Sequence, residues 1–253
     1  MMIIQLQKLI LIFLRITSFI VVCPGFSYKG FPNILKVSLS FVFTVLVYSI
    51  TPEIEIGNEL LHFLLLSFKE VLLGVAIGFI SKVIFAAAEI AGQLIDFQVG
   101  FSMASVYNPL SGTSASNYGK VYYWLSISLF FVLDLHHAVI ETLVKSFQYV
   151  PLGTVVLNEF NPEGIVKLFG MAFELGLNLS VPMIIVVLVT DIALGIISKT
   201  VPQINVLMLG MPLKAIISFI AFMMILSWVM REISGIVGSV PGYIENFLQS
   251  QRW

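Results

Sequence analysis

The 253-residue chain is 58% hydrophobic, and only 11% of its residues are charged, against roughly 25% in soluble domains. A soluble globule of this length lacks the polar surface to cover so much apolar area, so we exclude a soluble enzyme and a disordered chain. The net charge is −1 and the 13 basic residues do not cluster, which excludes a nucleic-acid-binding protein. The composition indicates an integral membrane protein, or one that exists only inside an apolar assembly.

The N-terminal segment 1–25 is similar to a signal peptide that ends before Cys23. Two residues argue against cleavage: Arg15 interrupts the apolar stretch, and Val22 occupies the position that requires a small side chain. We therefore expect the chain to keep this segment as its first helix. Because Cys23 is the single cysteine, an intrachain disulfide and a cysteine-based zinc site are both excluded.

Six strongly apolar windows follow one another along the chain, and each has the length of a helix rather than of a strand. Prolines and glycines lie between the windows and separate them. The predicted fold class is therefore all-α, an integral-membrane protein with long broken helices and hairpins in a single domain over 1–253. The windows, with an amphipathic tail, are 9–23, 34–51, 60–95, 121–140, 165–199, 204–230 and 233–253.

Two of these windows are too long for a single ordinary crossing of a bilayer. A continuous helix over 60–95 would be about 54 Å long, and the window 165–199 is similar, whereas a bilayer core is about 30 Å thick. We expect each window to fold into a hairpin, to tilt strongly, or to extend beyond the membrane against protein. Pro182 offers one place to break the second window. Pro202, Gly210 and Pro212 are expected to kink or interrupt the last apolar helix.

Charged side chains within the windows indicate that the chain is not surrounded by lipid alone. An ionised group facing lipid at mid-bilayer costs at least about 2.5–3.5 kcal/mol. These residues are tolerable if they face other subunits, pair across helices or lie outside the hydrocarbon. The pattern Gly74-x-x-x-Gly78 and the small residues over 86–92 also favour close helix contacts. We therefore favour a subunit that partners bury. The charged residues are Lys69, Glu70, Lys82, Glu89, Glu174, Asp191 and Lys214.

Motifs of enzymes and of cofactor sites are missing from the sequence. His137 and Glu141 share one helix face, but His136 is expected to point about 100° away, so we expect packing histidines and no metal site. Four acids, Asp96, Asp134, Glu174 and Asp191, are open to two interpretations: a proton relay in a secondary transporter, or structural pairing, which we favour.

The segment 97–119 has no charged residue, and twelve of the twenty residues from Gly100 to Gly119 are Gly, Ser, Thr, Asn or Pro. This composition disfavours a regular helix. A long loop without charge suggests a sheltered place, and irregular backbone at membrane depth is allowed only where protein buries it or a water-filled cavity adjoins it. We interpret 97–119 as a plug-like loop that closes a pore, with a plain surface loop as the alternative.

Two motifs resemble signatures of the FliR/SctT family of type III secretion export-apparatus proteins. The first is Ala91-Gly-Gln-Leu-Ile-Asp-Phe-Gln-Val-Gly-Phe-Ser102, and the second is Val201-Pro-Gln-Ile-Asn-Val206 followed by Gly210-Met-Pro-Leu-Lys214. Arg15 with Pro24, and later His136-His137, fit the same order over nearly the whole chain. The sequence departs from the family where Asp134-Leu135 replaces a frequent Asn-Gly before the histidines.

The resemblance implies a non-enzymatic core subunit of the flagellar export gate, without a cofactor, in the bacterial inner membrane and the flagellar basal body. It implies FliP-like, FliQ-like and FlhB-like partners, membrane lipid and transient unfolded export substrates; a virulence-type injectisome subunit is the alternative within the family. Residues carried over from the first motif as the pore plug are Gly100, Phe101, Ser102, Met103, Ala104, Ser105, Val106, Tyr107, Asn108 and Pro109. Residues carried over as motif or assembly positions are Gln98, Pro202, Gln203, Asn205, Gly210, Pro212 and Lys214.

Overall fold

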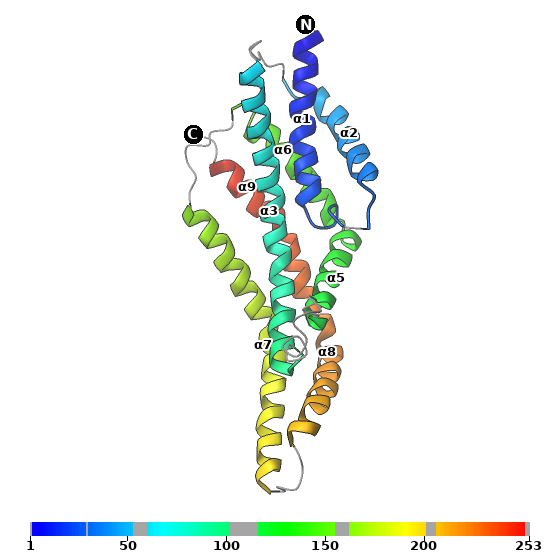
Figure 1. The fold of residues 1–253 in the computed structure, drawn as a ribbon, viewed down its shortest axis with the longest axis vertical. Coiled ribbons are helices and arrows are strands. Elements are labelled where there is room, and N and C mark those ends of the chain that lie inside the picture. Colours follow the sequence, from blue (N-terminus) through cyan, green and yellow to red (C-terminus); the bar gives the residue numbers. More distant parts are fainter. Residues whose placement is uncertain are drawn as a thin grey trace. The chain divides into compact units, whose positions relative to one another are not determined.

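The computed structural model describes residues 2–28, 30–52, 60–101, 116–154, 162–200 and 206–250. Within these ranges the regular structure is entirely helical, which confirms the all-α prediction (Figure 1). In chain order the helices are α1 (Met2–Val22), α2 (Asn33–Ile50), α3 (Leu60–Val99), α5 (Asn117–Val132), α6 (Leu135–Tyr149), α7 (Pro162–Thr200), α8 (Val206–Gly238) and α9 (Val240–Ser250).

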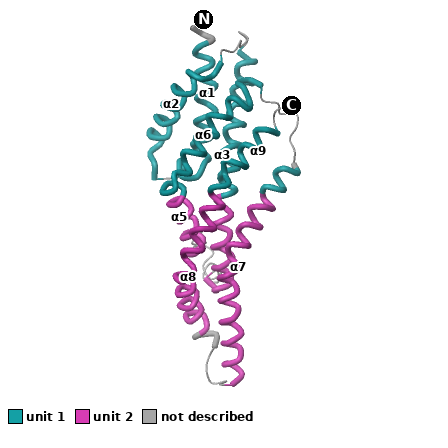
Figure 2. The backbone as a smooth tube through the Cα atoms, turned by 180° about the vertical axis from the view of Figure 1, so that it is seen from behind, with its two compact units in different colours: residues 1–84, 130–168, 238–253 teal, residues 85–129, 169–237 magenta. Residues whose placement is uncertain are grey.

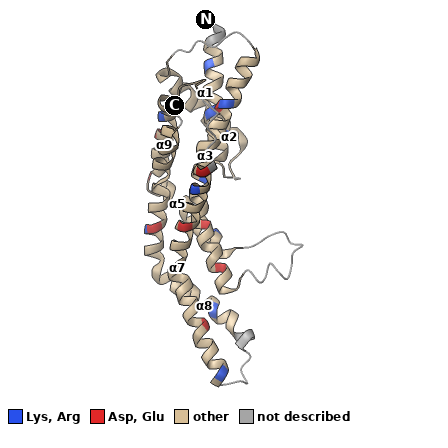
Figure 3. Cartoon of the chain, turned by 90° about the vertical axis from the view of Figure 1, so that its left-hand side faces the viewer, with Lys and Arg blue, Asp and Glu red and all other residues tan. Residues whose placement is uncertain are grey.

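Length and hydropathy allow five described helical segments to cross a bilayer, and the bent pair α5–α6 brings the number to six. Charged residues are few and scattered along these helices (Figure 3). The spans differ in how much of an 18-residue apolar window the chain itself covers: 61% of the window in α3 is buried, against 17% of α2. The chain therefore covers α3 more than α2, and α2 presents most of its surface to its surroundings.

Neither of the two over-long windows folds back on itself. Helix α3 is continuous over 40 residues, and α7 is continuous over 39 residues and passes through Pro182. Of the three arrangements expected for each window, the hairpin is therefore wrong, and a strong tilt or an extension beyond the bilayer remains. Helix α8 likewise continues through Pro212. A proline removes one backbone hydrogen bond, and a long apolar helix with many remaining bonds tolerates that loss.

Two predicted boundaries need correction. The window 121–140 is not one helix, because α5 ends at Val132, α6 begins at Leu135 and the two are bent by 75°. The break is at Asp134, the one described non-glycine residue with a left-handed backbone (φ 56°). The predicted tail at 233–253 is not a separate element, since α8 runs on to Gly238 and α9 covers Val240–Ser250.

The described helices divide into two compact units (Figure 2). Unit 1 comprises residues 1–84, 130–168 and 238–253, and unit 2 comprises 85–129 and 169–237. In unit 1, α1 packs along α2, and α6 packs against α9. Unit 2 is formed by the C-terminal part of α3 with α5, α7 and α8.

Glycines bring α1 and α3 together in unit 1. A Cβ atom on Gly74 would lie 2.3 Å from the carbonyl oxygen of Arg15, and a Cβ on Gly78 would lie 3.1 Å from that of Phe19. The first separation is shorter than a side chain tolerates, so only glycine permits the approach at position 74, and the second is tighter than an ordinary Cβ contact. The prediction that Gly74 and Gly78 form a helix contact is confirmed, and the contact is within the chain.

A buried ion pair lies at this α1–α3 contact. The Nε atom of Arg15 is 2.6 Å from Oε2 of Glu70, and both side chains are fully buried. Arg15 also donates to the carbonyl oxygens of Ser146 and Val150, while Glu70 accepts a hydrogen bond from the Gly153 amide. The pair therefore joins α1, α3 and the end of α6. It also explains how Arg15 is tolerated in an apolar window, since a buried charge needs both a partner and hydrogen bonds.

Candidate functional site

The structure describes both ends of the predicted plug loop 97–119, residues 97–101 and 116–119, and the first of these lies at the C-terminus of α3 in unit 2. The amides of Gly100 and Phe101 both donate to the carbonyl oxygen of Asp96, at 3.1 and 3.0 Å. Gly100 has φ +99°, a backbone that L side chains rarely adopt, so glycine is required to end α3 in this way. The plug residues Ser102, Met103, Ala104, Ser105, Val106, Tyr107, Asn108 and Pro109 lie outside the described residues.

The side chain of Asp96 joins this helix end to the start of α5. Its carboxylate accepts hydrogen bonds from the Ser116 hydroxyl (2.5 Å) and from the amides of Tyr118 (3.2 Å) and Gly119 (3.4 Å). Asp96 is 2% exposed. A carboxylate at a helix N-terminus satisfies otherwise unpaired amides and interacts favourably with the helix dipole. We call Asp96, Ser116, Tyr118 and Gly119 the Asp96 clamp, because one residue holds both ends of the loop, the first through its backbone carbonyl and the second through its carboxylate.

Close packing of α3 on α5 supports the Asp96 clamp. A Cβ atom on Gly92 would lie 2.3 Å from the amide nitrogen of Gly119, so glycine alone allows the two helices to approach at this point. Gly176 of α7 meets α3 similarly, where a Cβ atom would lie 2.7 Å from the Ala87 carbonyl oxygen. The small residues predicted over 86–92 to allow close helix contacts therefore do so within unit 2.

A second set of contacts links the first motif to α7 and α8. Gln98 donates to Oδ2 of Asp191 at 3.3 Å, and Lys214 forms an ion pair with Oδ1 of the same aspartate. The two predicted positions Gln98 and Lys214 thus meet through one acid. Lys214 and Asp191 are partly exposed, at 22% and 33% of their side chains. Partial burial strengthens such a pair relative to one in water.

Aromatic side chains pack against the same end of α5. The Tyr118 hydroxyl hydrogen-bonds to Oγ of Ser218 at 3.0 Å, and the ring of Phe222 packs edge-on against Tyr118 with centroids 5.6 Å apart. Phe101 lies with its ring centroid 6.3 Å from that of Tyr118. Phe101, the second predicted plug residue, is thereby placed next to the residue that Asp96 caps.

The second motif is only partly visible. Pro202, Gln203 and Asn205 lie outside the described residues. Gly210 is buried, and a Cβ atom there would lie 3.6 Å from the Leu194 side chain, an ordinary contact. Pro212 is exposed on α8. Of this motif, Lys214 is linked to the first motif through Asp191, which also accepts a hydrogen bond from Gln98.

Sequence reasoning did not assign the two acids of this site. The sequence left Asp96 and Asp191 in a group of four acids that could form either a proton relay or structural pairs. The structure places both in structural contacts, as the favoured interpretation expected. A signal was present for Asp96, because Ser116 with Asn117 before an apolar helix indicates a helix start that an anion can cap. No local signal indicated that Asp191 lies beside Gln98, which is 93 positions away.

Comparison with known proteins identifies the family. Residues 6–240 match the family described as bacterial export proteins, family 1. The chain is 34% identical to flagellar biosynthetic protein FliR of Bacillus subtilis over 86% of this chain and 85% of the relative. It is 29% identical to FliR of Aquifex aeolicus over 97% and 95%, and 29% identical to the secretion system apparatus protein SsaT of Salmonella typhimurium over 73% and 71%. The predicted resemblance is confirmed: the chain belongs to the FliR/SctT family of bacterial export proteins.

Proposed function

We propose that this chain is a core subunit of the flagellar type III protein-export gate in the bacterial inner membrane, and that its loop closes the export pore at rest. The flagellar names of the relatives from Bacillus subtilis and Aquifex aeolicus support the flagellar assignment. The subunit acts by forming and blocking a path for unfolded substrates rather than by catalysis, and energy for transport comes from other components.

The observation that carries the gating role is the Asp96 clamp. A segment that plugs a pore must be held firmly at its ends while its middle can yield to cargo. Asp96 holds both ends, since its backbone carbonyl and its carboxylate receive hydrogen bonds from residues before and after the loop. The contact of Gln98 with Asp191 adds a second attachment close to the first. The uncharged side chains between these ends would block ions without binding cargo strongly.

Exposed apolar side chains support an assembly with other gate subunits. On α7 and α8, Ile192, Phe219 and Met224 are each more than 60% exposed. The FliP-like and FliQ-like subunits that the resemblance implies would cover such faces together with lipid, and a FlhB-like protein would contact the complex. These partners are part of the proposal.

The relative SsaT favours an injectisome subunit as a second candidate. We prefer the flagellar role because the Bacillus subtilis FliR is more similar and matches a larger share of the chain. Replacing the chromosomal gene with a marker, and then measuring swimming and the secretion of non-flagellar effectors, distinguishes the flagellar role from the injectisome role. Loss of motility with intact effector secretion supports the flagellar role. Loss of effector secretion with intact motility supports the injectisome role. The transporter alternative is weaker, because Asp96 and Asp191 are both engaged by neighbouring side chains.

The test of gating compares ion leakage through the assembled complex in liposomes. Asp96→Ala removes the acceptor for Ser116 and for two amides, and loss of a helix cap costs about 1 kcal/mol, so leakage should rise. Asp96→Asn keeps an acceptor of the same size and should leak less than Asp96→Ala. Deleting part of 102–115 should also raise leakage.

The control is Glu174→Ala, which removes an exposed acid from α7 of the same unit. This complex should leak as little as the wild type. If Asp96→Ala and the shortened loop both assemble normally and leak no more than the wild type, the loop does not close the pore.

A further inference from the structure

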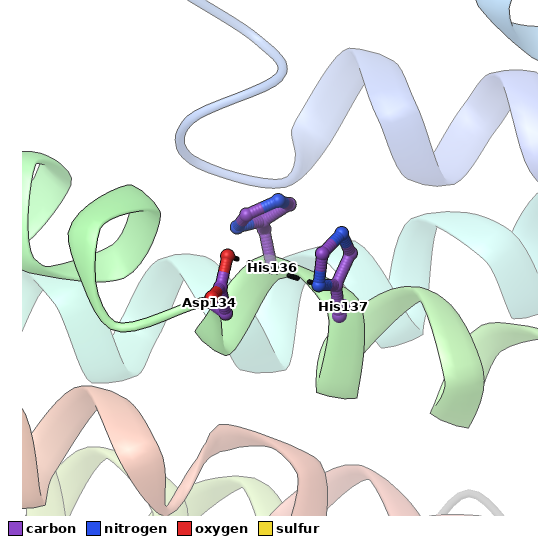
Figure 4. Close-up of side chains that lie close together, drawn as sticks. All are labelled: Asp134, His136 and His137. Carbon is purple, nitrogen blue, oxygen red and sulfur yellow. Dashed lines mark ion pairs between the residues drawn. The ribbon is translucent and has the colours of Figure 1, made fainter.

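Two histidines and an aspartate gather at the break between α5 and α6, in unit 1 and apart from the site described above. Among the described residues, Asp134, His136 and His137 form a group in which one ligand atom from each residue lies within 4.8 Å of the others. Figure 4 shows the carboxylate and the two imidazole rings together at the N-terminus of α6. The rotation of about 100° per helical residue predicted that His136 points away from His137. Their ring centroids are 4.1 Å apart, so that prediction is wrong.

The backbone explains how consecutive residues come together here. Asp134 has φ 56° and ψ 19°, the left-handed conformation, and it precedes the first residue of α6. An aspartate at this position usually caps the helix, yet its side chain makes no capping hydrogen bond. Instead, Oδ1 of Asp134 lies 3.8 Å from Nδ1 of His137. The carboxylate is therefore turned towards the imidazoles rather than towards the amides of the helix.

His136 provides an independent observation. Its Nδ1 atom is buried and has no hydrogen-bond partner among the described residues. A buried polar atom without a partner costs about 1–3 kcal/mol and calls for an explanation. The ring itself is held in place by Phe130 and Phe131, with centroids 6.1 and 5.3 Å away. A cation bonded at Nδ1 would satisfy this orphaned nitrogen in a ring that packing already orients.

The donor set selects the class of ion. Two imidazoles and one carboxylate suit first-row divalent transition metals such as Zn²⁺, Co²⁺ and Ni²⁺, whereas Mg²⁺ and Ca²⁺ prefer oxygen ligands. With metal–ligand bonds of about 2.0–2.2 Å, adjacent ligand atoms lie roughly 3–3.5 Å apart. The side chains of Asp134 and His137 are each 73% exposed, so rotation about their side-chain bonds can close the remaining distance without moving the backbone.

We propose that Asp134, His136 and His137 bind a divalent transition metal of the Zn²⁺ class, which fixes the 75° break between α5 and α6. The ion ties the residue at the break to the first turn of α6 and offsets the carboxylate charge. The proposal does not depend on the gating role, because it concerns a different unit and different residues.

The test uses the full chain in its native complex, purified through a tag without histidines and freed of metal by a chelator. Titration with Zn²⁺ by calorimetry, and with Co²⁺ by visible absorption, measures the number of ions bound and the affinity. Wild type should bind one more ion than the variants, with the tetrahedral or five-coordinate Co²⁺ spectrum of a site with nitrogen ligands. Zn²⁺ should also raise the thermal unfolding temperature of the wild type.

Two variants and one control make the result specific. Asp134→Asn keeps a side chain that tolerates the left-handed backbone, so the fold should survive while the carboxylate is lost. Asp134→Asn and His137→Gln should each weaken metal binding at least about tenfold. Loss of a residue that only hydrogen-bonds to a metal ligand already costs about that much. His62→Gln changes the exposed third histidine of the chain and should have no effect. Absence of the extra ion in the wild type, or equal binding by wild type and both variants, overturns the proposal.

Discussion

Among single residues, Arg15 and Glu70 stand out because they form a fully buried ion pair in unit 1. Both are fully buried and 2.6 Å apart, and each makes further hydrogen bonds to backbone groups near the end of α6. Breaking a buried pair by removing one charge costs about 3–5 kcal/mol, because the other charge stays buried without its partner. An exposed pair contributes about 0–1 kcal/mol. The consequences of removing the two kinds of pair should therefore differ clearly.

We predict that Glu70→Gln strongly destabilises the chain, by about 3–5 kcal/mol, since Arg15 keeps its charge and loses its counterion. Thermal unfolding of the complex, followed by tryptophan fluorescence, measures the effect. The matched control is Glu141→Gln, which breaks the exposed pair with Lys145 at 2.9 Å and should cost less than about 1 kcal/mol. Equal shifts in the two variants would show that Arg15 and Glu70 do not act as a buried pair.

Cys23 is predicted to be chemically silent in the folded protein. The residue follows α1, is 1% exposed, and burial raises the pKa of its thiol from 9.0 to about 12, against a smaller opposing effect of a hydrogen bond with Ser81. Because the thiolate is the reactive form, a maleimide at pH 8 should label the denatured chain and leave the folded chain unlabelled. Rapid labelling under native conditions would contradict this burial.

The same shift has a defined effect on stability. Between pH 9.0 and about 12 the folded state keeps a thiol proton that the unfolded state releases. Stability therefore falls as the pH rises through this window, and Cys23 contributes no pH dependence below it. The variant Cys23→Ala should lose this part of the alkaline pH dependence, which a series of unfolding curves at increasing pH would detect.

At the scale of helices, the contact of α1 with α3 depends on Gly74. A methyl group at this position would lie 2.0 Å from the Ser18 hydroxyl oxygen and 2.3 Å from the Arg15 carbonyl oxygen. The backbone of α1 would have to move, which would also displace Arg15 from Glu70. We predict that Gly74→Ala destabilises the chain by about 1–3 kcal/mol, the usual cost of overpacking.

The control for this prediction is Gly195→Ala on α7, where an added Cβ atom meets nothing within 4 Å. Alanine favours a helix over glycine by up to about 1 kcal/mol, so this change should be neutral or stabilising. The prediction is tested by comparing the thermal unfolding temperatures of the two variants with that of the wild type. If Gly74→Ala behaves like Gly195→Ala, the helices are not in tight contact at Gly74.

At the scale of the whole molecule, the structure gives a different reason to expect partner subunits from the one drawn from the sequence. The sequence indicated that charged residues in apolar windows would need other subunits, but Glu70 pairs with Arg15 and Asp191 pairs with Lys214 within the chain. The stronger reason is the apolar surface: the chain buries only 17% of α2 and only 17% of the 18-residue apolar window within Gly210–Ser250. Lipid covers part of such a surface, and helix partners would cover the rest.

We predict that the chain is short-lived when produced alone and persists when FliP-like and FliQ-like subunits are produced with it. Binding that stabilises only the folded state raises its stability by linkage. The half-life is measured by pulse-chase labelling at matched rates of synthesis. A long-lived, monodisperse monomer in mild detergent would contradict the prediction and would make a self-contained transporter the better interpretation.

Local properties made much of the fold predictable. Mean hydropathy over a window and the length of that window indicate a membrane helix, so the apolar windows correspond to helices within a few residues for α2 and α7. The break at Asp134 was missed, because no Gly or Pro marks the left-handed backbone there. The continuity of α3 and α7 was also missed, since a hydropathy window has no information about tilt or about extension beyond the bilayer.

The sequence by itself determined the membrane class, the helical fold, the family and two of the residues that meet at the site, Gln98 and Lys214. The membrane class and the helical fold follow from composition and window length, whereas the family and these two positions follow from the resemblance of the two motifs to the FliR/SctT signatures. Only the tertiary structure decided which polar side chains meet: Arg15 with Glu70, 55 positions away, and Gln98 with Asp191, 93 positions away. The physical reason is that a uniformly apolar helix carries no mark of its register against its neighbours. That register is set by where glycines such as Gly74 and Gly92 allow backbones to meet.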